Sequence, residues 1–149
     1  MSLHQFQNIN RYEPVPYILL IDEDQDDLDM YSFELKLKGV KVRTFESTEK
    51  ALVFLDLMSE TRDLPSLIIL DYNMPKKNGQ QVLQILKQNK DTKNIPVVVY
   101  STSISDQLRK QLSAAGALDC FAKPWNYRDI VTQVEIFQEK FIPHYHQTN

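Results

Sequence analysis

The chain has 149 residues, of which 42% are hydrophobic and 25% are charged, and this composition suits one compact domain with a single core. The formal net charge of -3 argues against nucleic acid as a partner, because such binding needs a basic excess or a clustered basic face. No apolar run approaches the roughly 20 residues that cross a bilayer, and the single cysteine cannot form an internal disulfide. We therefore expect a cytoplasmic protein with no nucleic-acid or membrane partner.

Short apolar runs alternate with segments of helical periodicity along most of the chain. Residues 1–16 come first; they are polar and aperiodic and are expected to form a flexible N-terminal leader. In chain order, the pattern then predicts strand 17–21, helix 25–38, strand 40–45, helix 48–58, strand 66–70, helix 80–90, strand 96–100, helix 105–115, strand 118–122 and helix 126–140.

This alternation predicts an α/β fold, a doubly wound parallel sheet with helices on both faces, because parallel neighbours need crossover connections of one hand. The runs at 66–70 and 96–100 are apolar throughout, as expected for strands that are buried on both sides. Such folds bind their ligands beyond the carboxyl ends of the strands. The residues directly after each predicted strand are therefore the candidates for a functional site.

Polar groups of useful kinds stand at the ends of four predicted strands. Acids follow the first and third strands, hydroxyls follow the fourth, and a lysine follows the fifth. They are Asp22, Glu23 and Asp24; Asp71; Ser101, Thr102 and Ser103; and Lys123 with Pro124. A doubly wound sheet would bring all four strand ends into one crevice.

The residue types in this crevice point to phosphoryl chemistry. Carboxylates from two strands suit Mg²⁺, which would offset the repulsion among Asp22, Glu23 and Asp71. A carboxylate beside a divalent ion can attack a phosphoryl donor, while a cation and a hydroxyl neutralise charge on the phosphoryl oxygens. The pattern thus predicts Asp71 as the nucleophile, Lys123 as the cation and Ser101 as the hydroxyl donor.

The same residues, in this order and spacing, closely resemble the receiver domain of two-component response regulators. The matching features are Asp22-Glu23 after the first strand, Asp71 in "DYNMPKKNG" with Pro75 and Gly79, Ser101 after "PVVVY", and Lys123-Pro124 after the fifth strand. The resemblance runs from about Tyr17 to Phe141. It implies a flavodoxin-like domain over 17–141, with five strands in the order 2-1-3-4-5 and five helices, and a C-terminal tail over 142–149.

By this resemblance, Asp71 is the phosphoacceptor. Asp22, Glu23 and Asp71, together with the backbone carbonyl of Asn73, would bind Mg²⁺. Glu23 stands where the family more often has Asp, and the longer side chain changes the metal geometry without being expected to abolish binding.

The resemblance also assigns roles to the fourth and fifth strand ends. Ser101 would be the switch hydroxyl and Lys123 the residue that contacts the phosphate. A cis peptide bond before Pro124 would direct Lys123 into the site. Thr102 and Ser103 are expected to tune access to the phosphate.

The implied function is that of a single-domain signalling switch rather than a metabolic enzyme. It would take a phosphoryl group from a sensor histidine kinase or a histidine phosphotransfer protein, lose it by hydrolysis, and signal by binding a downstream protein. The expected contact face runs roughly from Ser105 to Phe137. Cys120, expected to be a small buried hydrophobic residue, stands where the family usually has an aromatic switch residue, so the signal is expected to pass through residues 101–103 or neighbours such as Phe121.

The remaining acids near the first strand have a simpler expected role. Asp24, Asp26 and Asp27 suit the N-cap and first turn of the following helix, where the helix dipole favours negative charge. Asp29 is expected to face water.

Three alternatives use some of the same residues. An EF-hand calcium loop fits Asp22, Asp24 and Asp26 but fails at Asp27 and Phe33, which stand where it needs Gly and Glu. A haloacid-dehalogenase-type phosphatase would use Asp22 as nucleophile and Asp24 as acid/base, but it leaves the Asp71 motif unexplained. A receiver-like protein-binding scaffold that is not phosphorylated stays open.

Overall fold

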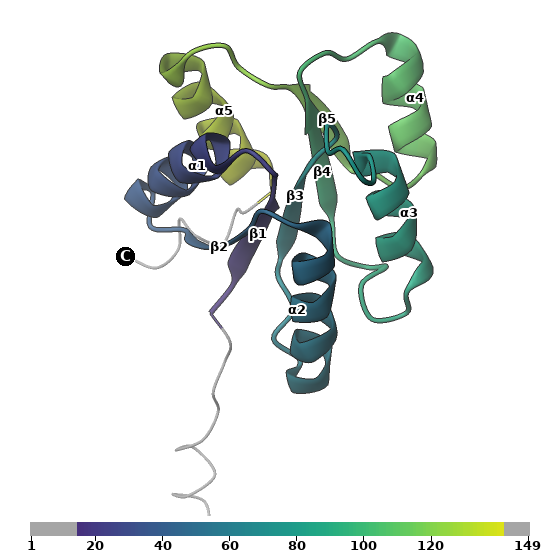
Figure 1. Ribbon diagram of the computed structural model, residues 1–149. Coiled ribbons are helices and arrows are strands. Elements are labelled where there is room, and N and C mark those ends of the chain that lie inside the picture. Colours follow the sequence, from purple (N-terminus) through teal and green to yellow (C-terminus); the bar gives the residue numbers. More distant parts are fainter. Residues whose placement is uncertain (1–14, 142–149) are drawn as a thin grey trace, which may run out of the picture.

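The computed structural model describes residues 15–141, so the expected tail and most of the expected leader lie outside the described residues. Strands and helices alternate as predicted (Figure 1). In chain order they are β1 (Tyr17–Ile21), α1 (Gln25–Leu37), β2 (Lys41–Phe45), α2 (Thr48–Thr61), β3 (Leu67–Asp71), α3 (Gly79–Gln88), β4 (Val97–Ser101), α4 (Asp106–Ala114), β5 (Asp119–Ala122) and α5 (Tyr127–Phe141). Each predicted element is confirmed, with ends within a few residues of those expected.

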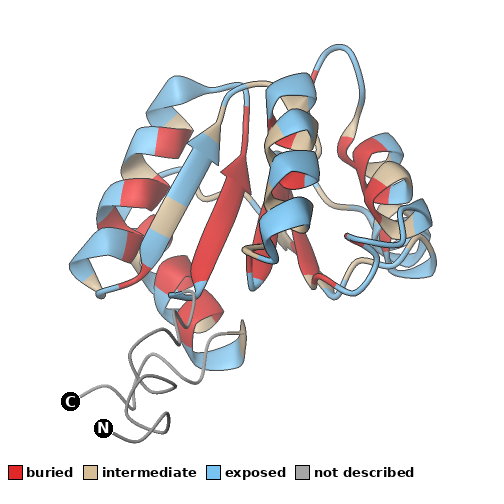
Figure 2. Ribbon diagram, turned by 90° about the horizontal axis from the view of Figure 1, so that it is seen from below, coloured by how far each residue is buried: buried red, intermediate tan, exposed pale blue. Residues whose placement is uncertain are grey.

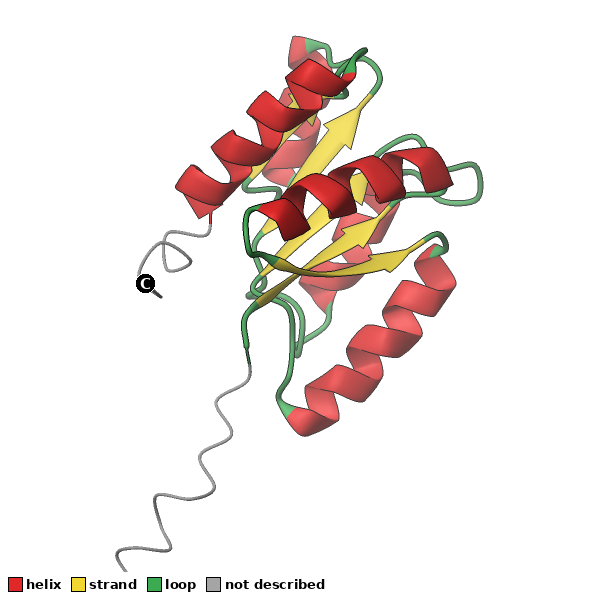
Figure 3. Ribbon diagram, turned by 90° about the vertical axis from the view of Figure 1, so that its left-hand side faces the viewer, coloured by secondary structure: helices red, strands yellow, loops and turns green. Residues whose placement is uncertain are grey.

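The strands form one parallel sheet in the order β2-β1-β3-β4-β5, which confirms the doubly wound fold. Strand β1 pairs with β3 from Ile18 opposite Leu67 to Ile21 opposite Leu70. Figure 3 shows the sheet as a middle layer with helices on both sides. The carboxyl ends of β1, β3, β4 and β5 therefore lie along one edge of the sheet, where the sequence places the polar residues.

The sheet separates two apolar clusters. Because side chains alternate along a strand, Leu19 and Ile21 pack with α2, α3 and α4, whereas Ile18 and Leu20 pack with α1 and α5. Figure 1 shows α1 and α5 side by side, apart from the other helices. Figure 2 shows the central strands buried and an edge strand mostly exposed, which is β2. The continuous apolar runs in the sequence thus correspond to strands covered on both faces.

Each of the five helices in the described residues begins at a side chain that accepts a hydrogen bond from a first-turn N–H group. These N-caps are Asp24 of α1, Ser47 of α2, Asn78 of α3, Ser105 of α4 and Asn126 of α5. Since each of these helices directly follows a strand, their positive ends gather at the carboxyl edge of the sheet and favour negative charge there. Within residues 15–141, none of the helices is long and apolar enough to span a membrane.

Candidate functional site

Two buried carboxylates stand at the carboxyl ends of the adjacent central strands. Asp22 directly follows β1 and Asp71 ends β3, and they expose 0% and 2% of their surface. Asp22 Oδ1 accepts a hydrogen bond from the Asp24 N–H, and Asp71 Oδ1 accepts one from the Asn73 N–H, each at 2.9 Å. These local backbone hydrogen bonds hold both carboxylates at the carboxyl edge of the sheet.

Lys123 reaches both of these carboxylates from the end of β5. Its Nζ lies 3.2 Å from Asp22 Oδ2 and 3.1 Å from Asp71 Oδ1, and its side chain is 13% exposed. The Lys123 backbone N–H donates to the Ser101 carbonyl at 2.7 Å. The structure therefore brings Asp22, Asp71 and Lys123 into one crevice, as the sequence predicted.

The expected cis bond before Pro124 is wrong: every peptide bond in the described part of the chain is trans. The trans isomer is favoured by about 0.5–1 kcal/mol at such bonds, so a cis bond needs a local reason. Here the backbone hydrogen bond from Lys123 to Ser101 already places the Lys123 side chain against the carboxylates. The Lys123 side chain therefore reaches the site with a trans peptide bond before Pro124.

The groups in the crevice alter one another's pKa values. Burial raises the pKa of the Asp22 carboxyl, and the negative charge of Asp71 acts in the same direction. Burial by itself would lower the pKa of the Lys123 ammonium, but the negative charge of Asp22, the hydrogen bond to Asp27 and the charge of Asp71 together raise it above its ordinary value. Lys123 is therefore a cation at neutral pH.

Asp27 also belongs to this crevice, which the sequence did not predict. It lies in the first turn of α1, and its Oδ2 is 3.0 Å from Lys123 Nζ. Asp24 is the N-cap, and Asp26 and Asp29 are exposed, as expected. The predicted place of Asp27 in the first turn of the helix is confirmed, and its contact with Lys123 is a further role that the sequence pattern did not indicate.

Tyr100 is a second site residue that the sequence pattern did not indicate, because it belongs to the apolar run 96–100, which predicts a buried strand. Its ring is fully buried, its hydroxyl donates to Asp22 Oδ2, and Lys123 Nζ lies 4.8 Å from its ring centroid. The ring centroids of Tyr31, in α1, and Tyr100 are 5.4 Å apart, and the Tyr31 hydroxyl donates a hydrogen bond to Oε1 of Gln133, in α5. Tyr100 thus connects the crevice to α1 and α5.

The hydroxyl of Ser101 is tied to its own loop and to Asn73. Ser101 Oγ lies 3.1 Å from Asn73 Oδ1 and 2.9 Å from the Ser103 carbonyl. The Thr102 N–H donates to the same Asn73 oxygen at 2.8 Å, and the Thr102 hydroxyl does so at 3.2 Å. The loops after β3 and β4 are therefore joined through the Asn73 side chain.

Glu23 lies apart from the two buried carboxylates. It is exposed and lines a small hollow with Lys76 and Lys77. Over residues 15–141, no three acidic, histidine or cysteine side chains form a group that could bind a metal ion by themselves.

The donor chemistry at Asp22 and Asp71 fits Mg²⁺. This ion usually takes one or two protein carboxylates and fills the rest of its shell with water, so it does not need a larger acidic group. Asp22, Asp27 and Asp71 also face the single ammonium of Lys123, which leaves an excess of carboxylates that a divalent cation can offset.

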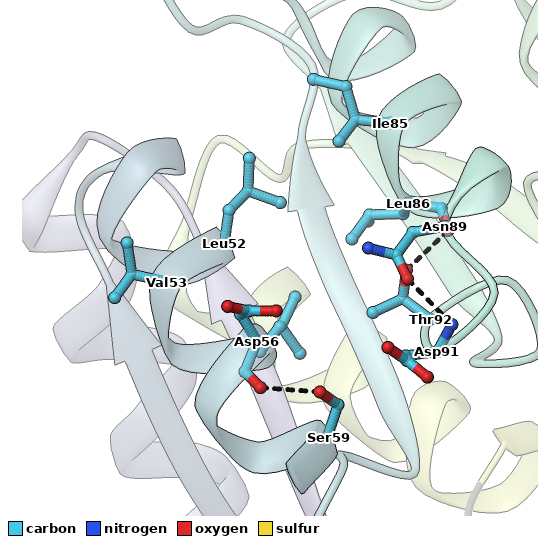
Figure 4. Close-up of a pocket in the computed structure, with 10 residues that line it drawn as sticks. Leu52, Val53, Asp56, Ser59, Ile85, Leu86, Asn89, Asp91 and Thr92 are labelled. Carbon is cyan, nitrogen blue, oxygen red and sulfur yellow. Dashed lines mark hydrogen bonds between the residues drawn. The ribbon is translucent and has the colours of Figure 1, made fainter.

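A separate hollow between α2 and α3 contains none of these residues (Figure 4). Its apolar lining comes from Leu52, Val53, Leu55, Ile85 and Leu86. Its two hydroxyl groups are engaged locally: the Ser59 hydroxyl donates to the Asp56 carbonyl at 2.6 Å, and the Thr92 hydroxyl donates to the Leu86 carbonyl at 2.6 Å. The candidate functional site is therefore the crevice at the strand ends, where the predicted residues lie.

The structure is thus an α/β domain whose doubly wound parallel sheet gathers two buried carboxylates, a hydroxyl and a lysine at its carboxyl edge. Comparison with known protein families identifies the class: the response regulator receiver domain matches residues 18–135. The chain therefore belongs to the response regulator receiver domain family of two-component signalling.

Individual relatives are similar over most of the described chain. The two-component response regulator ORR13 of Oryza sativa subsp. japonica is 31% identical over 116 residues, which cover 77% of this chain and 92% of that protein. Response regulator Rcp1 of Synechocystis sp. is 37% identical over 94 residues, which cover 60% of this chain and 64% of that protein.

Solved structures show the same architecture. The Mn(2+)-bound form of response regulator Rcp1 superposes with a TM-score of 0.76 at 28% identity, covering 87% of this chain and 96% of that chain. The phosphorylated cyanobacterial phytochrome response regulator RcpA gives a TM-score of 0.75 at 27% identity, covering 85% of this chain and 94% of that chain. A divalent metal is thus bound in at least one structural relative.

Proposed function

We propose that this receiver domain accepts a phosphoryl group on Asp71, with Mg²⁺, from the phosphohistidine of a sensor kinase or a phosphotransfer protein. The observation that carries the proposal is the position of Lys123 Nζ, 3.1 Å from Asp71 Oδ1 in a buried crevice. The phosphorylated state of RcpA and the Mn(2+)-bound state of Rcp1, both similar to this chain, support it.

In the proposed reaction, a carboxylate oxygen of Asp71 attacks the phosphorus of the phosphohistidine. An O–P bond forms while the N–P bond breaks, and the imidazole leaves. Lys123 donates hydrogen bonds to the phosphoryl oxygens and offsets their charge. The Ser101 hydroxyl adds a further hydrogen bond when it turns away from Asn73, and Thr102 and Ser103 shape access to the phosphoryl group. Hydrolysis later restores the carboxylate.

The proposed metal ligands are Asp22, Glu23, Asp71 and the backbone carbonyl of Asn73. When bound, Mg²⁺ supplies positive charge beside the phosphoryl oxygens. The two buried carboxylates are already held at the strand ends by hydrogen bonds from backbone N–H groups. The exposed side chain of Glu23 is free to turn toward them, whereas Asp22 and Asp71 are fixed.

The geometry argues against the haloacid-dehalogenase-type alternative. That reaction needs Asp22 as an accessible nucleophile, but Asp22 has no exposed surface. One of its oxygens accepts the Asp24 N–H, and the other accepts the Tyr100 hydroxyl. Both oxygens of Asp22 are therefore engaged, whereas the backbone hydrogen bond and the Lys123 ion pair of Asp71 both use Oδ1. We therefore favour Asp71 as the nucleophile.

The proposed output is protein–protein contact through the face formed by α4, β5 and α5, so the domain acts as a switch and modifies only itself. Leu118 and Trp125 are 56% and 94% exposed at this face. Cys120, at the position of the usual aromatic switch, is buried, while the ring of Phe121 packs 5.1 Å from that of Phe137. We propose that the signal passes through the loop at 101–103. A cytoplasmic location accords with the free thiol.

The test is phosphorylation of the purified protein by acetyl phosphate with Mg²⁺. We expect an acid-stable, base-labile adduct of one phosphoryl group in the wild type, measured by intact-protein mass spectrometry. Asp71→Asn should form none, whereas Asp56→Asn, which removes an exposed carboxylate of α2, should be labelled like the wild type. Absence of an adduct in the wild type would contradict the proposal and favour the protein-binding scaffold.

A further inference from the structure

Lys123 has a third carboxylate partner, Asp27, that neither the metal site nor the phosphoacceptor uses. We propose that Asp27 is a positioning residue that holds Lys123 in the resting state and weakens the site's affinity for free phosphoryl anions. The inference rests on the proposed function of Asp71.

The geometry around the ammonium supports this role. A lysine ammonium has three donors, and Lys123 Nζ faces three carboxylate oxygens: Asp22 Oδ2 at 3.2 Å, Asp27 Oδ2 at 3.0 Å and Asp71 Oδ1 at 3.1 Å. The Asp27 contact is thus as close as the other two, and the Asp27 side chain is 22% exposed. A phosphoryl oxygen can bind Lys123 only by displacing one of these partners.

The three partners differ in what else they do. In the proposed reaction, Asp71 becomes the acyl phosphate, and Asp22 would bind the metal from its present position. Asp27 has no such second role, so it competes with the phosphoryl group for Lys123 both before and after transfer. It also brings a negative charge close to the position that an anionic donor must reach.

The approach to the site adds to this effect. Asp27, Asp24, Lys123 and Trp125 line one hollow. A small anion in this hollow would lie near the carboxylates of Asp24 and Asp27 as well as the ammonium of Lys123. A protein donor brings further contacts that offset the repulsion, so Asp27 selects against small free anions.

The first turn of α1 offers a matched control. Asp26 and Asp27 are both acids at the helix start, where the dipole favours negative charge, but Asp26 is exposed. Asp26→Asn therefore removes the same charge from the same turn without touching Lys123. Asp27→Glu keeps the carboxylate and tests whether the charge, rather than the exact side chain, is responsible.

The experiment measures two quantities for each variant in excess Mg²⁺: the concentration of beryllofluoride, a phosphoryl analogue, that half-saturates the protein, and the acetyl phosphate concentration that gives half the maximal labelling rate. For Asp27→Asn we expect both to fall about three- to tenfold, since a partly exposed charge acts through a screened interaction. Asp26→Asn should match the wild type, and Asp27→Glu should lie closer to the wild type than Asp27→Asn does. Thermal melting shows whether each variant is folded.

The outcomes separate the two proposals. If the wild type takes up phosphoryl groups but Asp27→Asn behaves like Asp26→Asn, or binds the anions more weakly than the wild type, this inference is overturned and the proposed function stands. If the wild type takes up none, the proposed function fails and this inference fails with it.

Discussion

Tyr100 places a phenol hydroxyl inside the site, where it donates to Asp22. Burial, followed by the negative charge of Asp22, raises its pKa well above the ordinary value, so the hydroxyl remains a donor at neutral pH. A hydrogen bond to a charged acceptor in a dry environment is stronger than one between neutral groups. Tyr100 therefore stabilises the ionised form of a carboxylate that burial disfavours.

Replacing Tyr100 with Phe should lower the free energy of unfolding by about 1–3 kcal/mol, because Asp22 Oδ2 loses a buried donor. Urea denaturation at pH 7 measures this change. The loss should be smaller when Asp22→Asn is already present, since the acceptor is then neutral. An equal loss in both backgrounds would show that the hydroxyl stabilises the protein through some other contact.

Residues at strand ends could be predicted from the sequence, but contacts made by individual side chains could not. Asp22, Asp71, Ser101 and Lys123 converge because parallel strands end at one edge, whatever their rotamers. The Asp27 contact depends on how α1 is set against β5, and no residue pattern reports that packing. The roles of these residues in phosphoryl transfer stay predictions.

At the scale of elements, the start of α3 is set by a close approach of two backbones. The Gly79 N–H donates to the Tyr72 carbonyl at 3.0 Å, and a Cβ on Gly79 would lie 2.7 Å from Tyr72 Cα. Only a residue without a side chain fits this contact. The hydrogen bond from Gly79 thereby keeps the start of the loop after Asp71 in contact with the N-terminus of α3.

Gly79→Ala should therefore lower the free energy of unfolding by about 1–3 kcal/mol, the usual range for overpacking at a rigid contact. Chemical denaturation measures the change. Gly39→Asn is the control: Gly39 has a φ of 79° with no atom within 4 Å of an added Cβ, and Asn tolerates positive φ. A Gly79→Ala variant as stable as Gly39→Asn would mean that the loop relaxes freely.

The ends of helices and strands can be predicted from the sequence only where a marker residue stands at the boundary. Strand β1 lies at the predicted 17–21, bounded by Pro16 and the acids that follow. Helix α2 continues past the predicted 58 to Thr61 and ends at Arg62, whose φ of 59° is left-handed. Glycine normally marks such an end, so a helix that stops at an arginine gives no sequence signal.

At the scale of the whole molecule, the site stands where both halves of the core meet. The two apolar clusters lie on opposite faces of β1, β3 and β4, and the buried carboxylates Asp22 and Asp71 stand at the carboxyl ends of β1 and β3. A ligand that binds only when the strands are paired therefore stabilises the entire domain. Metal binding should therefore raise the free energy of unfolding of the whole domain.

Mg²⁺ at a hundredfold excess over its dissociation constant should raise the free energy of unfolding by about 2.7 kcal/mol. For a domain of this size, each kcal/mol corresponds to about 2–4 °C in melting temperature. Calorimetry with Mg²⁺ and with EDTA measures the shift. Asp22→Asn should lose it, while Asp29→Asn, an exposed acid of α1, should retain it. A full shift in Asp22→Asn would remove Asp22 from the metal site.

Trp125 is the one tryptophan of the chain and is 94% exposed. It lines the hollow that contains Asp27 and Lys123. Indole emission responds to nearby charge and to solvent, so an anion that arrives beside Lys123 changes the fluorescence of the native protein. The domain thus carries its own optical reporter, and occupancy of the site can be followed in real time without a label.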